Sequence, residues 1–157
     1  MFDFWKSKSL DCIIEPVDGK GGLYLGNLKS AEDVHNLHKM NIKAVLTVIA
    51  NTNLKYKTFD VFDHKIIPAE DEEEFDISIF FKEGIEFLEK SLEKTNVLTH
   101  CFAGISRSSS IVIAYIMKSK KMTYEKALRE VRAKRSIVHP NLGFGKQLIA
   151  FEKEIQV

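Results

Sequence analysis

The sequence predicts an α/β fold: a central, mainly parallel sheet of about five strands flanked by helices. Short apolar runs rich in β-branched residues, at residues 43–50, 61–67 and 96–99, alternate with stretches of helical periodicity. This alternation is typical of parallel strands, which need long, usually helical, crossover connections. The last run also passes through a short loop directly into an apolar helix at residues 108–121.

The first part of the chain is expected to hold an arm, two strands and a helix. Residues 1–10 form the arm, and residues 11–26 contain two short strand candidates. Ser30 is expected to cap the helix, because its hydroxyl can accept an N–H of the first turn and acidic residues follow it. The arm carries three aromatic side chains, Phe2, Phe4 and Trp5.

Three further helices are predicted around the motif that follows the last strand. Apolar residues at helical spacing indicate a helix over residues 76–94. Thr123 is expected to cap a helix that ends near Lys134, and Asn141 a final helix. Residues 11–157 are therefore expected to form one domain, with no repeat or low-complexity segment.

Residues 100–108, with the sequence HCFAGISRS, place a cysteine, five small or apolar residues and an arginine in one loop. A strand, a tight loop and a helix in this order present backbone N–H groups to an anion. Gly104 lets the loop turn without a Cβ penalty, and Arg107 offers a planar fork that matches two phosphate oxygens. Both the N–H groups and the guanidinium favour a thiolate at Cys101, which makes it a candidate nucleophile.

A phosphoryl transfer to Cys101 also needs a proton donor for the leaving oxygen. Asp71 is the best candidate, because it follows a strand-like run and so lies at a strand end. It belongs to the acidic run of residues 70–74, and such runs are usually solvated surfaces. Glu72 or another neighbour therefore remains an alternative general acid.

Residues 99–110, with the sequence THCFAGISRSSS, resemble the signature of the dual-specificity protein phosphatases, a family of cysteine-dependent protein tyrosine phosphatases. Further similarity lies in residues 23–26, 42–48, 71, 127–135 and 140–148. The resemblance covers roughly residues 11–155 and is to a small, stand-alone type. It implies a protein-tyrosine-phosphatase-like fold and hydrolysis of phosphotyrosine and phosphoserine or phosphothreonine in proteins, through a cysteinyl-phosphate and without a cofactor.

The resemblance also implies roles for individual residues. Cys101 would be the nucleophile, Arg107 would bind the phosphate, and Asp71 would act as general acid and then as general base. The other residues implied in catalysis are Ser108, which would donate to the sulfur, and His100, which would support the loop from outside. The residues implied in substrate binding are Phe102, Ala103, Gly104, Ile105, Ser106, Arg107 and, near the mouth, Arg135, while Asn141 would brace the loop.

The composition and net charge limit which binding partners and which cellular compartment are expected. A net charge of +1, with 45% hydrophobic and 29% charged residues, gives no global attraction to nucleic acid or membrane. Only two cysteines are present, so a disulfide framework is not expected, and a reactive thiol favours the cytoplasm or the nucleus. We expect a phosphorylated protein as substrate, phosphate or sulfate in the loop, no metal, and a monomer or weak dimer.

Four other functions share some of these features. Inositol phospholipid phosphatases of the superfamily usually carry lysines inside the loop, and residues 102–106 contain none. RNA 5′-phosphatases have a more basic surface than a net charge of +1 suggests. Rhodanese-like sulfur transfer is disfavoured by Arg107 followed by Ser108. A phosphoprotein-binding module without turnover is the remaining alternative, although relatives of that kind typically lack the cysteine.

Overall fold

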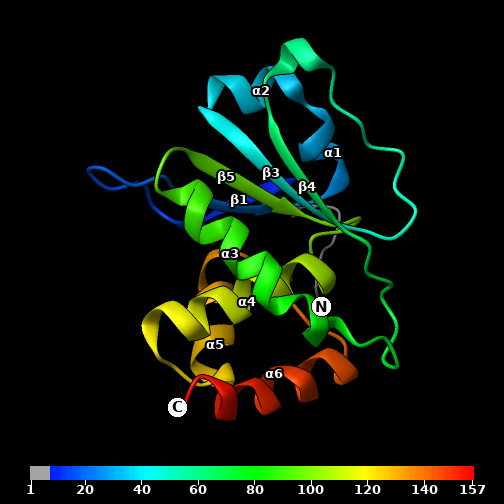
Figure 1. The fold of residues 1–157 in the computed structure, drawn as a ribbon, viewed down its shortest axis with the longest axis vertical. Helices are drawn as coiled ribbons and strands as arrows, with labels where there is room; N and C mark the ends of the chain where they lie inside the picture. The colour runs from blue at the N-terminus through cyan, green and yellow to red at the C-terminus, as the bar shows by residue number, and fades with distance from the viewer. Residues whose placement is uncertain (1–7) are drawn as a thin grey trace.

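The computed structural model describes residues 8–157, in which a five-stranded sheet carries helices on both faces (Figure 1). The strands lie in the order β1-β2-β5-β3-β4, and only β1 runs antiparallel to its neighbour. They are β1 (Leu10–Ile14), β2 (Leu23–Gly26), β3 (Ile42–Val48), β4 (Asp63–Ile67) and β5 (Asn96–His100). The predicted fold class, a mainly parallel sheet between helices, is confirmed.

Helices cover the two faces unequally. The segments are α1 (Leu28–Glu32), α2 (Val34–Lys39), α3 (Phe81–Leu92), α4 (Arg107–Lys120), α5 (Tyr124–Lys134) and α6 (Leu142–Glu154), with short 3-10 turns η2 (Thr58–Asp60) and η3 (Ile77–Phe80). In Figure 1, α1 and α2 lie on one side of the sheet and α3 to α6 on the other. Because both faces are covered, the buried strand β3 is almost continuously apolar.

Alternation along the strands divides the core into two clusters. Leu46, Val48 and Val97 point into the larger cluster, which helices α3 to α6 complete. Val45 and Leu98 point to the opposite face, into a smaller cluster with residues of α1 and α2. The α1/α2 face of the sheet also carries polar side chains.

The helix boundaries differ from expectation where several capping residues compete. Thr123 and Asn141 cap α5 and α6 as predicted, each accepting a backbone N–H. Ser30 does not begin its helix. Asn27 caps α1 instead, and Asp33 caps a separate helix, α2, so the expected single helix is divided into two.

Two other expectations are corrected or left aside. The helix expected from residue 76 begins as the 3-10 turn η3 and ends at Leu92 in α3. Leu10, which we assigned to the N-terminal arm, begins β1, and the arm's aromatic residues (Phe2, Phe4 and Trp5) lie outside the described residues.

The parallel strands bring the candidate residues to one edge of the sheet. The four strands β2, β5, β3 and β4 run in the same direction, so their carboxyl ends meet at one edge. Cys101 follows β5 directly, and Asp71 follows β4 after a short segment. Within residues 8–157, no helix combines the length and the apolar character that a membrane crossing requires.

Candidate active site

The loop between β5 and α4 has its carbonyl groups fixed outward. Every carbonyl from residue 101 to residue 105 accepts a hydrogen bond from a group around the loop. The donors are His100 Nδ1 to Cys101 (3.0 Å), Leu28 N to Phe102 (3.0 Å), Arg135 Nη2 to Ala103 (3.2 Å), Arg135 Nε to Gly104 (3.0 Å) and His139 N to Ile105 (2.8 Å). The loop conformation is therefore determined by its surroundings.

Outward carbonyls imply inward N–H groups. In a planar trans peptide the C=O of one residue and the N–H of the next point in opposite directions, and the described residues contain no cis peptide bond. Between residues of the described chain, no hydrogen bond uses the N–H groups of residues 102–107 as donors. These N–H groups, with the N-terminus of α4, form a concave array suited to a tetrahedral oxyanion.

Gly104 is required by the shape of the loop. Its φ is +69°, in the left-handed region that favours glycine. A Cβ at this position would also lie 2.5 Å from the carbonyl oxygen of Gly26 and 2.7 Å from Arg135 Nη2. Any side chain would therefore push the loop away from β2 and from the arginine that holds it.

The cysteine lies at the base of the array. Cys101 is 2% exposed, and the Ser108 hydroxyl donates a hydrogen bond to Sγ at 3.1 Å. Arg107, the first residue of α4, donates from Nη1 to the carbonyl of Ala69 (3.2 Å), while its buried Nε has no partner among the described residues. Because an unpaired buried donor is costly, this nitrogen indicates where an anion would bind. The site thus joins a nucleophilic sulfur, N–H donors and one arginine.

Asp71 is linked to this loop through Asn141. The Asn141 side chain donates to Asp71 Oδ1 (3.0 Å), and its backbone N–H donates to Ser106 Oγ (2.9 Å). Asp71 itself is exposed, so it is accessible to a substrate. For Glu72, the alternative acid, the structure records no such link to the cysteine loop.

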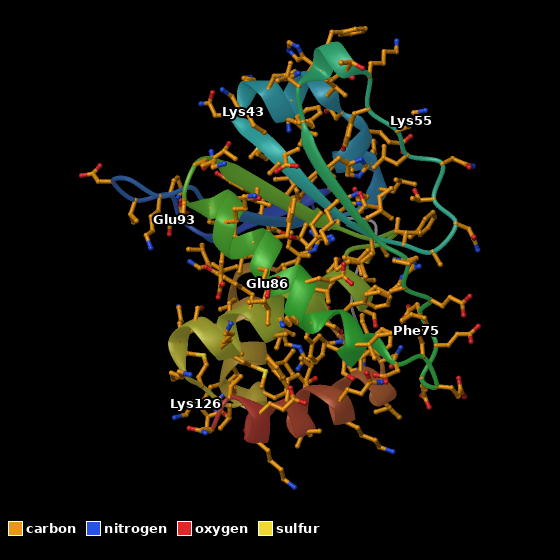
Figure 2. All side chains as sticks on the ribbon, in the orientation of Figure 1. Lys43, Lys55, Phe75, Glu86, Glu93 and Lys126 are labelled. Atoms are coloured by element: carbon orange, nitrogen blue, oxygen red, sulfur yellow. The ribbon has the colours of Figure 1, made fainter. Side chains whose placement is uncertain are left out.

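Helix α6 holds the loop that carries Asp71 and the acidic run of residues 70–74. Gly143 allows a close approach, since a Cβ there would lie 1.9 Å from the carbonyl oxygen of Glu73. Gln147 donates from Nε2 to the carbonyl of Phe75 (2.9 Å) and accepts the N–H of Ser78 (2.9 Å). Figure 2 labels Phe75 on this loop, near the start of α6. The position of Asp71 therefore depends on contacts between α6 and residues 73–78.

His100 lies beneath the loop in a fully buried position. Burial lowers the pKa of His100 to about 4, so the imidazole is neutral at physiological pH. Its Nδ1 lies 3.0 Å from the Cys101 carbonyl oxygen, which only accepts hydrogen bonds. His100 is thus in contact with the loop from the side opposite the anion position.

Arg135 does not lie near the mouth of the site, contrary to expectation. It is 2% exposed, and its guanidinium lies behind the loop, bound to the carbonyls of Ala103 and Gly104. A salt bridge to Asp11 (2.9 Å) and a hydrogen bond to the Lys8 carbonyl (2.8 Å) both engage Nη1, so four of its five N–H groups are bonded behind the loop. A guanidinium bound in this way lies away from the mouth of the site, so Arg135 fixes the loop instead.

The rim of the site is formed by residues we expected to bind substrate. Phe102 is 67% exposed and Ala103 is also exposed, whereas Ile105 is half-buried and Ser106 is buried. Leu28 and the backbone of His139 contact the loop, and Asp11 pairs with Arg135 behind it; none of these three contacts was expected from the sequence. In the described part of the chain, no group of three or more His, Cys, Asp or Glu side chains is arranged to hold a metal ion.

Comparisons with known proteins agree with this geometry. A family model described as the dual specificity phosphatase catalytic domain matches residues 23–154. Dual specificity protein phosphatase 1B of Arabidopsis thaliana is 40% identical over 136 residues, covering 86% of this chain and 80% of that protein. Human dual specificity protein phosphatase 22 is 41% identical over 133 residues, covering 84% and 71%.

Solved structures show the same similarity. The human tyrosine phosphatase-like serine/threonine/tyrosine-interacting protein is 32% identical with a TM-score of 0.84, covering 94% of this chain and 98% of that one. The crystal structure of DUSP15 is 32% identical with a TM-score of 0.77, covering 90% and 93%.

Proposed function

Since the chain belongs to the dual specificity phosphatase family, whose catalytic domain acts on phosphotyrosine and on phosphoserine or phosphothreonine in proteins, we propose that its own residues hydrolyse these esters through Cys101. One observation carries the proposal: the carbonyls of residues 101–105 are all bonded from outside the loop. The N–H groups left on the inner side match the equatorial oxygens of a phosphoryl group directly above the sulfur.

In the first step Cys101 Sγ attacks phosphorus, so a P–S bond forms as the P–O bond to the substrate breaks. Asp71 gives its proton to the departing oxygen, which leaves as an alcohol or phenol. Arg107 and the loop N–H groups stabilise the three equatorial oxygens of the transition state.

In the second step water attacks the same phosphorus and Asp71 accepts its proton. The P–S bond breaks, and the sulfur leaves as a thiolate that the Ser108 hydroxyl stabilises, given its 3.1 Å hydrogen bond to Sγ. Inorganic phosphate is released, and Asp71 regains the proton needed for the next cycle.

A doubly phosphorylated Thr/Tyr peptide tests the proposal, with EDTA present and Cys101→Ser assayed beside the wild type. We expect phosphate release from both sites by the wild type and none by the variant. If neither site is hydrolysed by a folded protein, phospholipid and RNA 5′-phosphate substrates are the next to assay. Tight phosphopeptide binding without turnover would instead indicate a binding module.

The role of Asp71 is separable from that of its acidic neighbours. Asp71→Asn should lower kcat strongly on alkyl phosphates, whose leaving oxygen needs a proton, and much less on an activated aryl phosphate. Glu72→Gln is the matched control and should leave both rates near the wild-type value. The reverse result would assign the general acid to Glu72.

The same site supports two further parts of the proposal. Phosphate or sulfate should bind in the loop, because Arg107 Nε has no partner among the described residues. Both cysteines are free thiols, so the chain should act in a reducing compartment, the cytoplasm or the nucleus. It should act there as a monomer or weak dimer. Residues 11–157 would form its single catalytic domain.

A further inference from the structure

Three polar side chains from neighbouring strands meet on the α1/α2 face, behind the catalytic loop. Thr47 Oγ1 in β3 lies 2.7 Å from His100 Nε2 in β5 and 2.7 Å from His64 Nε2 in β4. Thr47 and His100 are fully buried, and His64 is half-buried. Together with the bond from His100 Nδ1 to Cys101, these contacts form a continuous chain from His64 to the loop.

The direction of every hydrogen bond in this chain follows from the Cys101 carbonyl. A carbonyl only accepts, so His100 Nδ1 must carry the hydrogen. His100 is neutral, so its Nε2 has no hydrogen and accepts from the Thr47 hydroxyl. That hydroxyl has one hydrogen only, so its oxygen accepts from His64, which must carry a hydrogen on Nε2.

The position of the His64 ring is fixed by its neighbours. The Tyr56 ring packs edge-on against it, with centroids 4.8 Å apart. Tyr56 in turn donates its hydroxyl hydrogen to the Ala31 carbonyl of α1. Residues 52–58, which include Lys55 in Figure 2, line one side of a hollow beside His64 and Ile66. The donor nitrogen of His64 is thus aimed at Thr47 by packing.

We propose that His64 is a positioning residue of the catalytic loop, whose Nε2–H acts through Thr47 to hold His100 in the tautomer that binds the Cys101 carbonyl. With that carbonyl held outward, the planar peptide directs the Phe102 N–H into the loop, where the oxyanion binds. His64 touches neither substrate nor Cys101. The proton arrangement is independent of the proposed function, and only the expected effect on catalysis rests on it.

Nitrogen-15 NMR of the histidine-labelled protein tests the proton arrangement without any substrate. We expect His100 in the Nδ1–H form and His64 in the Nε2–H form at neutral pH. A wild-type His64 that carries its hydrogen on Nδ1 would overturn the proposal. This measurement is informative even if a His64 variant fails to fold or if the chain acts on another phosphate ester.

Substitutions then test the consequence. In His64→Leu we expect His100 to become a mixture of tautomers, kcat/KM to fall about three- to tenfold and the Kd of inorganic phosphate to rise by a similar factor, the usual effect of one neutral hydrogen bond. His64→Gln keeps a donor and should restore most of the loss. His35→Leu, at an exposed histidine of α2, is the matched control and should change nothing.

A double-mutant cycle distinguishes action through Thr47 from a general structural effect. Because Thr47→Val removes the connecting hydroxyl, His64→Leu should have little further effect on phosphate binding or His100 in that background. Additive effects of the two substitutions would overturn the proposed connection. So would a folded His64→Leu protein with unchanged His100 tautomer and unchanged phosphate affinity.

Discussion

Replacing Arg135 with methionine should destabilise the whole protein and loosen the catalytic loop. The guanidinium is buried, and its salt bridge to Asp11 joins side chains that are 1% and 18% exposed. Removing one partner of a buried ion pair costs about 3–5 kcal/mol, because the other charge stays in a poorly solvated place. The carbonyls of Ala103 and Gly104 lose their donors in the same change. We therefore expect the free energy of unfolding to fall by about 3–5 kcal/mol.

Denaturant unfolding and steady-state kinetics measure the two effects on the same protein. Freed carbonyls let the loop N–H groups turn away from the oxyanion, so kcat should fall about tenfold or more, with KM less affected. In the double variant Arg135→Met with Asp11→Leu, the loss of stability should be smaller than the sum of the single losses, because no unpaired charge remains. If the free energy of unfolding of Arg135→Met lies within about 1 kcal/mol of the wild-type value and the substitution only raises KM, Arg135 contacts the substrate and does not hold the loop.

Three other substitutions or conditions test local features. Gly143→Ala places a methyl group against the Glu73 carbonyl, so kcat on alkyl phosphates should fall about tenfold while hydrolysis of an activated aryl phosphate changes little; equal losses would contradict this. Burial lowers the pKa of His100 to about 4, below the pKa of a histidine in the unfolded chain. The free energy of unfolding should therefore be highest above about pH 6.5 and should fall by about 3 kcal/mol as the pH is lowered to 4. Denaturant titrations of His100→Gln should not show this fall. Val61 is exposed at φ +60°, a costly conformation for a β-branched residue, so Val61→Gly should raise the unfolding free energy by about 0.5–1 kcal/mol, and a decrease would refute the strain.

Features set by local sequence were predictable. The parallel sheet follows from the alternation of apolar runs and helices, and Thr123 and Asn141 cap their helices because capping involves only neighbouring residues. Ser30 was assigned wrongly for a related reason: Asn27 and Asp33 are equally good caps, and tertiary packing decides among them. Local propensity therefore predicts that a helix exists better than where it begins.

Long-range contacts were not predictable from spacing. Arg135 and Asp11 are 124 positions apart in the sequence, so nothing near Arg135 indicated a buried partner behind the loop. The contact between Thr47 and His64 likewise depends on the register of β3 against β4. That Cys101 and Arg107 share one loop was predictable because this loop is short, whereas the residues that hold its carbonyls come from four separate elements or segments: β5, α1, the end of α5 and the segment after it.

The most direct test of the account is to trap the phosphoenzyme. A radiolabelled phosphotyrosine peptide is mixed with Ser108→Ala, quenched within milliseconds, and the labelled site identified by mass spectrometry. Loss of the hydrogen bond to Sγ should slow the second step, so label should accumulate on Cys101 to nearly one equivalent, and none should appear on Cys101→Ser. Label on another residue, or rapid phosphate release with no labelled protein at any time, would contradict a cysteinyl-phosphate mechanism.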